Sequence, residues 1–213
     1  MAEYTLYCFA QSGNAYKPAL YLQLAGADWA PRFVDFFNGE GRGADFLAKN
    51  VMGEVPILEH GATSLTQSGV ILDYLVSTIG RFGWNSEEER REILRWILFD
   101  NHKFTSYIAT YRFLLNFAPK PAAPEVLEFL KGRVKVTAKV LAAHLAGRDF
   151  VVGDRLTIAD LSLAGYVYFA PEYGIDWAAD YPPIQAWAER IKAQPGWRHP
   201  YDLMPGHPLP GRS

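Results

Sequence analysis

The sequence predicts an α/β unit followed by an all-helical unit, and two changes in pattern indicate this division. Up to about Gly80, short β-prone runs alternate with helical runs. Beyond residues 80–85 the β pattern disappears, and apolar residues recur every three, four or seven positions. Such a change is typical of two separately packed units, an α/β one and an all-α one. The predicted boundaries are residues 1–80 for the α/β unit, 86–200 for the helical unit and 201–213 for an irregular tail.

In the first unit, the predicted elements follow the order βαβαββα. Residues 4–9 form an apolar, β-prone run, and residues 14–25 form a helical run that Gly26 ends. The remaining predicted elements are a strand at 32–36, a loop at 38–43, a short helix at 44–49, a hairpin of strands at 56–59 and 64–66, and a helix at 68–78. A parallel crossover followed by an antiparallel pair gives a small mixed sheet.

The helical unit opens with a capping box. Ser86 and Glu89 have the spacing in which a serine caps a helix and the third-position glutamate returns the contact. The helix that they begin is predicted to run as far as the prolines from Pro119 onward. Its apolar residues predicted to share one side are Ile93, Ile97, Phe104, Ile108, Tyr111 and Leu115.

Further helices and a second capping box follow. Pro124 starts a helical run that stops at Gly147. Its apolar side carries Val126, Leu130, Val134, Leu141 and Leu145. Thr157 and Asp160 form the second capping box, and a last helix begins at Pro183. From Pro205 onward the chain is too rich in proline and glycine for either helix or strand.

Composition excludes several classes of protein. With 49% hydrophobic residues, the chain has enough apolar surface to fold, so it is not intrinsically disordered. Its 21 basic and 23 acidic residues leave a formal charge of -2, without the basic excess that nucleic acid or an anionic membrane surface requires. The first residues have neither the basic nor the apolar region of a signal peptide, and no run is long enough to span a membrane. We therefore expect a cytoplasmic protein.

The cysteine and histidine contents limit the chemistry. Cys8 is the single cysteine, which excludes an internal disulfide, a CxxC pair and a multi-thiolate metal site. It lies within an apolar run and is expected to be a buried core thiol. The five histidines are scattered without metal-binding spacing, so no metal site is predicted. The chemistry must use oxygen, nitrogen or a thiol supplied by another molecule.

Three segments of the first unit could together bind a small anionic peptide. Ser12 and the pair Gln67–Ser68 each precede or open a helix, where free N–H groups and the helix dipole favour an anion. Val55–Pro56 precedes a strand, and if the bond is cis, the backbone of Val55 turns outward and can pair with a peptide. Taken singly, each serine is better explained as a helix cap, and the proline as an ordinary strand start.

With these motifs, the sequence resembles the cytosolic glutathione transferases from Tyr4 to about Trp197. The matching motifs, in the family's order, are Ser12-Gly13-Asn14, Gly53-Glu54-Val55-Pro56-Ile57-Leu58, Gln67-Ser68 with Ile71 and Tyr74-Leu75, and Val152-Gly153-Asp154 before Thr157-Ile158-Ala159-Asp160. The resemblance implies a thioredoxin-like N-terminal domain that carries the glutathione site. It also implies a helical C-terminal domain with most of the second-substrate pocket, and a homodimer.

The resemblance assigns roles to individual residues. Ser12 matches the serine that hydrogen-bonds the glutathione sulfur, while Asn14 is a rival for that contact because some bacterial members use an asparagine at this position. Val55, followed by a cis Pro56, matches the residue whose backbone pairs with the cysteinyl part. Gln67 and Ser68 match the pair that holds the γ-glutamyl carboxylate.

Other residues are weaker candidates in the light of the resemblance. Tyr7 lies one position out of phase with the tyrosine that other members use, and neighbours in a strand face opposite sides. The residues near the expected glycyl carboxylate are Arg42, Lys49 and Asn50, and those near the expected second-substrate pocket are Lys103, Tyr107 and Tyr111. Asp100 could reach the glutathione amine in the partner subunit or form an ion pair on the helix surface.

The expected activity is therefore that of a glutathione transferase. Glutathione would be the co-substrate, its thiolate would attack a small hydrophobic electrophile, and no metal, nucleic acid or membrane would take part. A glutathione-dependent disulfide or peroxide reductase is an alternative that the Ser-Gly-Asn loop does not distinguish. A binding protein that keeps the fold without turnover is a third reading. The sequence does not identify the second substrate.

Overall fold

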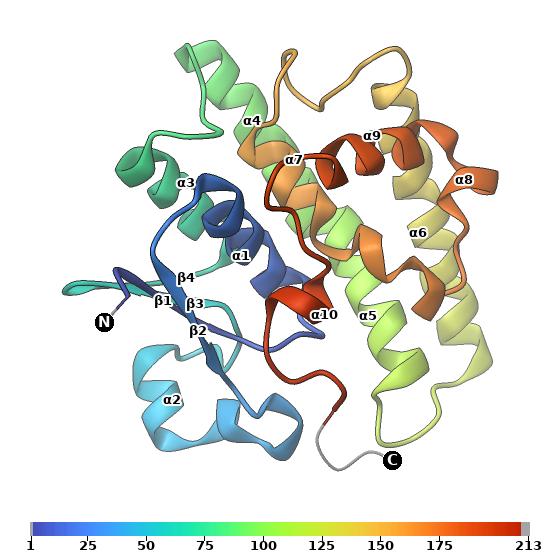
Figure 1. The fold of residues 1–213 in the computed structure, drawn as a ribbon. Helices are drawn as coiled ribbons and strands as arrows, with labels where there is room; N and C mark the ends of the chain where they lie inside the picture. Colours follow the sequence, from blue (N-terminus) through green and yellow to red (C-terminus); the bar gives the residue numbers. More distant parts are fainter. Residues whose placement is uncertain (1, 210–213) are drawn as a thin grey trace. The chain divides into compact units, whose positions relative to one another are not determined.

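The computed structural model describes residues 2–209, which form two compact units (Figure 1). The first unit contains residues 2–81 together with 194–209, and the second contains residues 82–193. Within the described residues, no helix is long and apolar enough to cross a membrane.

The first unit is built on a four-stranded mixed sheet in the order β2-β1-β3-β4. The strands are β1 (Tyr4–Cys8), β2 (Trp29–Phe33), β3 (Ile57–His60) and β4 (Thr63–Thr66), and the helices between and after them are α1 (Gly13–Ala25), α2 (Ala44–Lys49) and α3 (Ser68–Ile79). Strand β1 pairs in parallel with β2, and β3 is antiparallel to both of its neighbours. Helices α1 and α3 lie on one side of this sheet and α2 on the other (Figure 1). The predicted βαβαββα order is confirmed.

The predicted position of the second strand was wrong by three residues. It was expected at 32–36 and is found at Trp29–Phe33, with Pro31 in its middle. Because β2 is an edge strand, it pairs only with β1, and a proline without an N–H is tolerated there. The expected bounds, 32–36, place Pro31 outside the strand. The expected loop at 38–43 is also partly ordered, into the 3₁₀ turns η1 (Phe36–Asn38) and η2 (Glu40–Arg42).

The second unit is helical, as predicted, but its first long helix is interrupted. Helix α4 (Glu87–Phe99) continues through a π-helical turn, η3 (Asp100–Phe104), into α5 (Thr105–Asn116). The later elements are α6 (Pro124–Leu145), α7 (Ile158–Leu163), the 3₁₀ segment η4 (Ala164–Glu172), α8 (Trp177–Asp180) and α9 (Pro182–Lys192). The box at Thr157 is formed in full. At Ser86, the serine caps as predicted, but Glu89 returns its contact to the backbone N–H of Asn85.

Two residues predicted to face the core of the second unit are exposed. Val126 is 45% exposed and Leu115 is 42% exposed. Leu115 lies in the last turn of α5 and Val126 in the first turn of α6, on either side of the connection between the two helices. At this end of the helix pair the apolar periodicity continues beyond the packed region. The other predicted core positions, including Ile93, Phe104 and Val134, are buried.

The C-terminal segment belongs to the first unit. It contains the short helix α10 (Pro200–Leu203). The first three residues of the tail at 201–213, which was expected to be irregular, are therefore helical. Pro200 occupies the first helical turn, and the Nδ1 atom of His199 accepts a hydrogen bond from the N–H of Tyr201. The part of the expected tail at 210–213 lies outside the described residues.

Candidate functional site

The register of the sheet brings the three candidate segments to one end of the first unit. Tyr7, near the end of β1, lies opposite Ile57, which begins β3. Ile57 in turn lies opposite Thr66, which ends β4. These three strand ends are therefore side by side. The loop with Ser12 follows β1, Val55–Pro56 precedes β3, and Gln67–Ser68 follows β4. Separate signals in the sequence thus lie at the same end of the sheet.

Ser12 is buried and caps helix α1. Its Oγ atom accepts a hydrogen bond of 3.2 Å from the N–H of Ala15, and its own backbone N–H donates to Phe9 at 3.0 Å. The hydroxyl oxygen therefore acts as an acceptor within the helix cap, while its hydrogen can be donated outward. The structural and the chemical roles of Ser12 are compatible, because one oxygen can accept and donate at the same time.

Asn14 lies in the first turn of α1, with its side-chain oxygen buried. Among the described residues, this Oδ1 atom has no hydrogen-bond partner. A buried, unpaired amide oxygen is costly, and it indicates a polar group that completes the site when ligand is bound. Asn14 therefore fits a contact, beside Ser12, with a hydrogen-bond donor of a ligand, because its unpaired oxygen is an acceptor.

The peptide bond between Val55 and Pro56 is cis, as the resemblance implied. The loop before it is held by Asn50, whose Nδ2 donates to the carbonyl of Glu54 at 2.7 Å and whose Oδ1 accepts from the N–H of Met52 at 3.1 Å. Gly53 has a φ of +66°, and a Cβ atom there would lie 2.8 Å from the carbonyl oxygen of Gly41. Asn50 and Gly53 thus fix the strand start that presents the backbone of Val55.

Gln67 has an unusual backbone conformation for a residue with a side chain. Its φ is +68°, and it lies directly before the first turn of α3. Such a conformation costs free energy, and non-glycine residues that keep it are concentrated at functional sites. The Gln67 amide donates to the sulfur of Met52, a weak acceptor, at 2.9 Å. Ser68 is buried as the first residue of α3.

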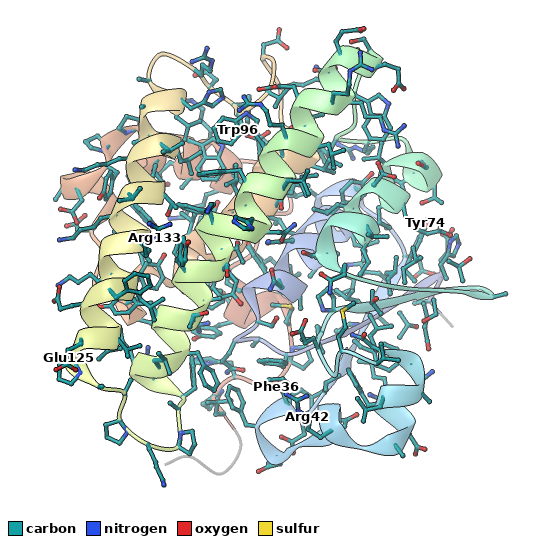
Figure 2. All side chains as sticks on the ribbon, turned by 180° about the vertical axis from the view of Figure 1, so that it is seen from behind. Phe36, Arg42, Tyr74, Trp96, Glu125 and Arg133 are labelled. Atoms are coloured by element: carbon teal, nitrogen blue, oxygen red, sulfur yellow. The ribbon has the colours of Figure 1, made fainter. Side chains whose placement is uncertain are left out.

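The structure separates the three candidates for the glycyl carboxylate. Asn50 uses its side-chain amide within its own loop, and Lys49 forms an ion pair of 2.6 Å with Glu59. Arg42 is exposed (labelled in Figure 2), and its guanidinium lies beside Gly53, within the loop that leads to Val55. Among the three, Arg42 combines an available charge with a place next to the candidate site.

Tyr7 faces a different feature, a cavity of about 340 Å³ on the α2 side of the sheet. Its hydroxyl donates to Glu59 at 2.9 Å, and Arg32 lies over its ring at 4.6 Å. The cavity is lined by Tyr7, Arg32, Glu40, Gly43, Ala44, Asp45, Phe46 and Lys49, and so contains none of the three candidate segments. Its two cations are paired with Glu40 and Glu59, which leaves no net positive charge to attract an anion.

Cys8 is the buried core thiol that the sequence predicts. Its side chain is 0% exposed, and burial raises the pKa of its thiol to about 12. At neutral pH this sulfur is protonated and inaccessible, so it is neither a nucleophile nor a metal ligand. Within residues 2–209, no group of three or more His, Cys, Asp or Glu side chains could hold a metal ion.

In the second unit, Lys103 and Tyr107 form a basic cluster with Arg133, a residue that the sequence analysis missed. Arg133 lies on α6 (Figure 2), and its Nη2 atom donates to the hydroxyl of Tyr107 at 3.0 Å. This hydrogen bond, together with the charges of Arg133 and Lys103, lowers the pKa of Tyr107. Tyr111 is buried in the core of the unit. No periodicity in the sequence pairs Tyr107 with a residue 26 positions away.

Asp100 is placed differently from either expectation. It is completely buried in the π turn, where its carboxylate accepts hydrogen bonds of 2.6 Å from Thr105 and from Ser162. The expected contact with a partner subunit and the expected ion pair on the helix surface are both wrong. The apolar residues around it gave no sign in the sequence that this acidic residue would face inward.

The fold and the residues gathered at the sheet end define the class of protein. Family models match the chain as "Glutathione S-transferase, N-terminal domain" over residues 2–77 and as "Glutathione S-transferase, C-terminal domain" over residues 104–195. The chain belongs to the glutathione S-transferase family, with a thioredoxin-like first unit and a helical second unit.

Individual relatives cover nearly the whole chain. It is 28% identical to glutathione S-transferase 3 of Zea mays over 223 residues, covering 100% of both chains. It is 27% identical to the disulfide-bond oxidoreductase YfcG of Escherichia coli over an alignment of 194 residues that covers 88% of this chain and 89% of that protein.

Solved structures share the same fold. A structure described as that of a possible glutathione S-transferase from Rhodopseudomonas palustris is 33% identical, with a TM-score of 0.83 over 93% of this chain and 98% of that one. A structure of Ure2p in complex with S-hexylglutathione is 25% identical, with a TM-score of 0.84 over 92% and 96% of the two chains.

Proposed function

We propose that this protein is a glutathione transferase in which Ser12 stabilises the glutathione thiolate. The observation that carries the proposal is the geometry of Ser12, whose Oγ accepts from Ala15 within the helix cap and whose hydrogen can then be donated to a ligand. The positive end of the α1 dipole lies at the same place and favours a negative sulfur. Membership of the family and the similarity to a structure with bound S-hexylglutathione support glutathione as the co-substrate.

The proposed reaction needs no general base from the protein. The bound thiol releases its proton to solvent, and the Ser12 hydroxyl donates a hydrogen bond to the resulting thiolate. The thiolate sulfur then forms a bond to an electrophilic carbon of the second substrate, and the leaving group departs with its bonding electron pair. Each unit by which the site lowers the thiol pKa corresponds to about 1.4 kcal/mol of stabilisation of the anion.

The rest of glutathione would bind along the other two segments. The backbone of Val55, beside the cis bond to Pro56, would pair with the cysteinyl unit in the manner of an added strand. Gln67 and Ser68, at the N-terminus of α3, would hold the γ-glutamyl carboxylate. Arg42 would contact the glycyl carboxylate, because it is the candidate whose charge is available beside the loop at Gly53.

A glutathione-dependent disulfide reductase is the second candidate. The similarity to the oxidoreductase YfcG, at 27% identity over 88% of this chain, favours it. In that reaction the bound thiolate attacks one sulfur of a disulfide and releases the other as a thiolate. A second glutathione then resolves the mixed disulfide and forms oxidised glutathione. A binding protein without turnover is a third candidate, and retention of the polar site residues argues against it.

The second substrate would bind to the helical unit, and the protein would act as a homodimer. Lys103 and Tyr107 are the accessible members of the expected pocket, since Tyr111 is buried. Apolar side chains on the surfaces of α4 and α6 support a second copy as the partner; they are Leu94, Leu98, Phe129, Val136 and Val140.

The function is tested with variants of two helix-capping serines, of which only Ser12 lies at the proposed glutathione site. Ser12 and Ser86 each cap a helix, and each Oγ accepts from the N–H three residues later at 3.2 Å. Ser12→Ala should raise the pKa of bound glutathione and lower kcat by about 10- to 100-fold. Ser86→Ala should cost only about 1 kcal/mol of stability. The pKa is measured from thiolate absorbance as a function of pH, kcat from steady-state kinetics, and stability from thermal unfolding.

The same experiment distinguishes the alternatives. An unchanged pH–rate profile in Ser12→Ala, with a shifted profile in Asn14→Ala, transfers the sulfur contact to Asn14. Conjugation of an aromatic halide and reduction of a disulfide, assayed side by side, separate transferase from reductase. Calorimetry that detects no uptake of glutathione at millimolar concentration refutes the proposed function altogether.

A further inference from the structure

The C-terminal segment of the first unit is hydrogen-bonded to the loop that precedes Ser12. The backbone N–H of Ala10 donates to the carbonyl of Pro205 at 2.7 Å. The side-chain Nε2 of Gln11 donates to the carbonyl of Gly206 at 2.8 Å, across 195 residues of sequence. These two contacts, which we call the tail latch, hold the two residues that come directly before Ser12.

The segment that forms the tail latch has its own anchors. The hydroxyl of Tyr16 on α1 donates to the carbonyl of Arg198 at 2.8 Å, and Leu203 and Met204 are buried. Gly206 has a φ of +92°, and a Cβ atom there would lie 2.5 Å from Cε2 of Phe33. The latch is therefore built from the opposite end of the chain, on a backbone that only glycine can follow at this point.

We propose that Gln11 is a positioning residue, which through its bond to Gly206 fixes the loop so that the Ser12 hydroxyl is aimed at the glutathione sulfur. The inference rests on the proposed function. Ser12 is held on its C-terminal side by the helix cap to Ala15 and on its N-terminal side by the bond to Phe9. Between Phe9 and Ser12, the tail latch ties Ala10 and Gln11 to the C-terminal segment of the same unit.

The direction of a hydrogen bond explains why such positioning matters. An O–H donor to an anion prefers an angle above about 150° and weakens steeply below about 120°, so a rotation of Ser12 that takes its hydroxyl out of this range weakens its effect on the thiolate. The two bonds of the tail latch end on Ala10 and Gln11. Val55 directly precedes the start of β3 and Gln67 directly precedes α3, so neither is held by the latch, and binding of the rest of glutathione should not depend on it. The latch should thus affect the thiol pKa more than the affinity.

Two variants break the latch from opposite sides. Gln11→Ala removes the donor and leaves the tail unchanged. Gly206→Ala displaces the acceptor through the clash with Phe33 and leaves residue 11 unchanged. Gly26→Ala is the matched control: Gly26 also has a positive φ, of +69°, but nothing lies within 4 Å of a Cβ there. It introduces the same kind of backbone strain without moving the tail.

The readouts are the pKa of enzyme-bound glutathione, from thiolate absorbance against pH, and the separate kcat and KM values. In Gln11→Ala and Gly206→Ala we expect the bound thiol pKa to rise by about half a unit or more, which is a factor of about three in the thiolate equilibrium. We expect kcat to fall by at least that factor at pH values below the pKa, with KM for glutathione within about twofold, while Gly26→Ala changes neither.

Each outcome decides the proposal. A bound thiol pKa that is the same in Gln11→Ala, Gly206→Ala and the unchanged protein overturns the positioning role. A rise in KM without a shift in pKa also overturns it, because the latch would then only maintain the fold. If the unchanged protein takes up no glutathione, or does not lower its pKa, both the positioning role and the proposed function fail.

Discussion

The indole N–H of Trp187 donates to the carboxylate of Asp160 at 2.9 Å, and both side chains are completely buried. The same Oδ1 atom accepts from the N–H of Val151 at 2.8 Å, while Oδ2 accepts from the N–H and the hydroxyl of Thr157. A carboxylate in a helix-capping box therefore joins α7 to α9 and to the segment before α7. Burial raises the pKa of Asp160, and its four donors oppose that shift.

Replacing Asp160 by Ala should lower the free energy of unfolding by about 3–4 kcal/mol, because it leaves several buried donors without an acceptor. The matched control is Asp176→Ala. Asp176 also caps a helix, accepting from Ala178 and Ala179, but it is exposed. Its loss should cost about 1 kcal/mol. Urea unfolding of both variants measures the difference, and equal losses would show that the buried network adds nothing beyond a cap.

The sequence could predict the Thr157–Asp160 capping box because its two residues are three positions apart, and local spacing fixes their geometry. Trp187 could not be predicted as a partner, since 27 residues separate it from Asp160. The same distinction holds elsewhere. Helix caps such as Ser12 and Gly26 were predicted, whereas the register of β2 depended on whether Pro31 would lie at a sheet edge.

The candidate site follows the same rule. Ser12, Val55–Pro56 and Gln67–Ser68 could be singled out, because each is a local motif at the start of a helix or strand. The pairing of Tyr107 with Arg133 and of Gln11 with Gly206 could not, because each joins residues far apart in sequence. The burial of Asp100 was also unpredictable, since its partner Ser162 lies 62 positions away.

Cys8 should be inert in the folded protein. Because it is fully buried and its pKa is raised to about 12, a thiol reagent at about pH 8 should label it only after unfolding. Cys8→Ala should keep kcat within about twofold, since the proposed chemistry uses the thiol of glutathione. Mass spectrometry of reagent-treated native and urea-unfolded protein tests the first point. Rapid labelling of the native protein would contradict the assignment of Cys8 to the core.

Gln67 should show a conflict between stability and binding. Its φ of +68° is costly for any side chain, so Gln67→Gly should stabilise the protein by about 1 kcal/mol. Loss of the amide should raise the KM for glutathione about tenfold while kcat changes less, because the γ-glutamyl carboxylate that we propose it holds is remote from the sulfur. Gln67→Ala is the control: it removes the same amide and keeps the strain. If both variants bind glutathione normally, Gln67 has no role in the site.

The ion pair between Glu89 and Arg155 should make the second unit sensitive to acid. The Nη1 and Nη2 atoms of Arg155 each donate to the Glu89 carboxylate at 2.8 Å, and these hydrogen bonds lower the pKa of Glu89. A carboxyl group whose folded pKa is lowered contributes stability that is present above its unfolded pKa, about 4.3, and is lost as the pH falls through the folded value. Glu89→Gln should therefore destabilise the protein by about 2 kcal/mol at neutral pH, and by progressively less below about pH 4.

Glu92 on the same helix is the control for this prediction. Its carboxylate is also paired, with Arg95 three residues later, but its side chain is 40% exposed, whereas that of Glu89 is 15% exposed. Exposed pairs of this spacing contribute little, so Glu92→Gln should change stability by less than about 0.5 kcal/mol at any pH. Urea midpoints measured from about pH 7 to pH 3 compare the two. Parallel pH curves for Glu89→Gln and the unchanged protein would mean that Glu89 titrates alike in the folded and unfolded chains, and that its contact with Arg155 does not stabilise the start of α4.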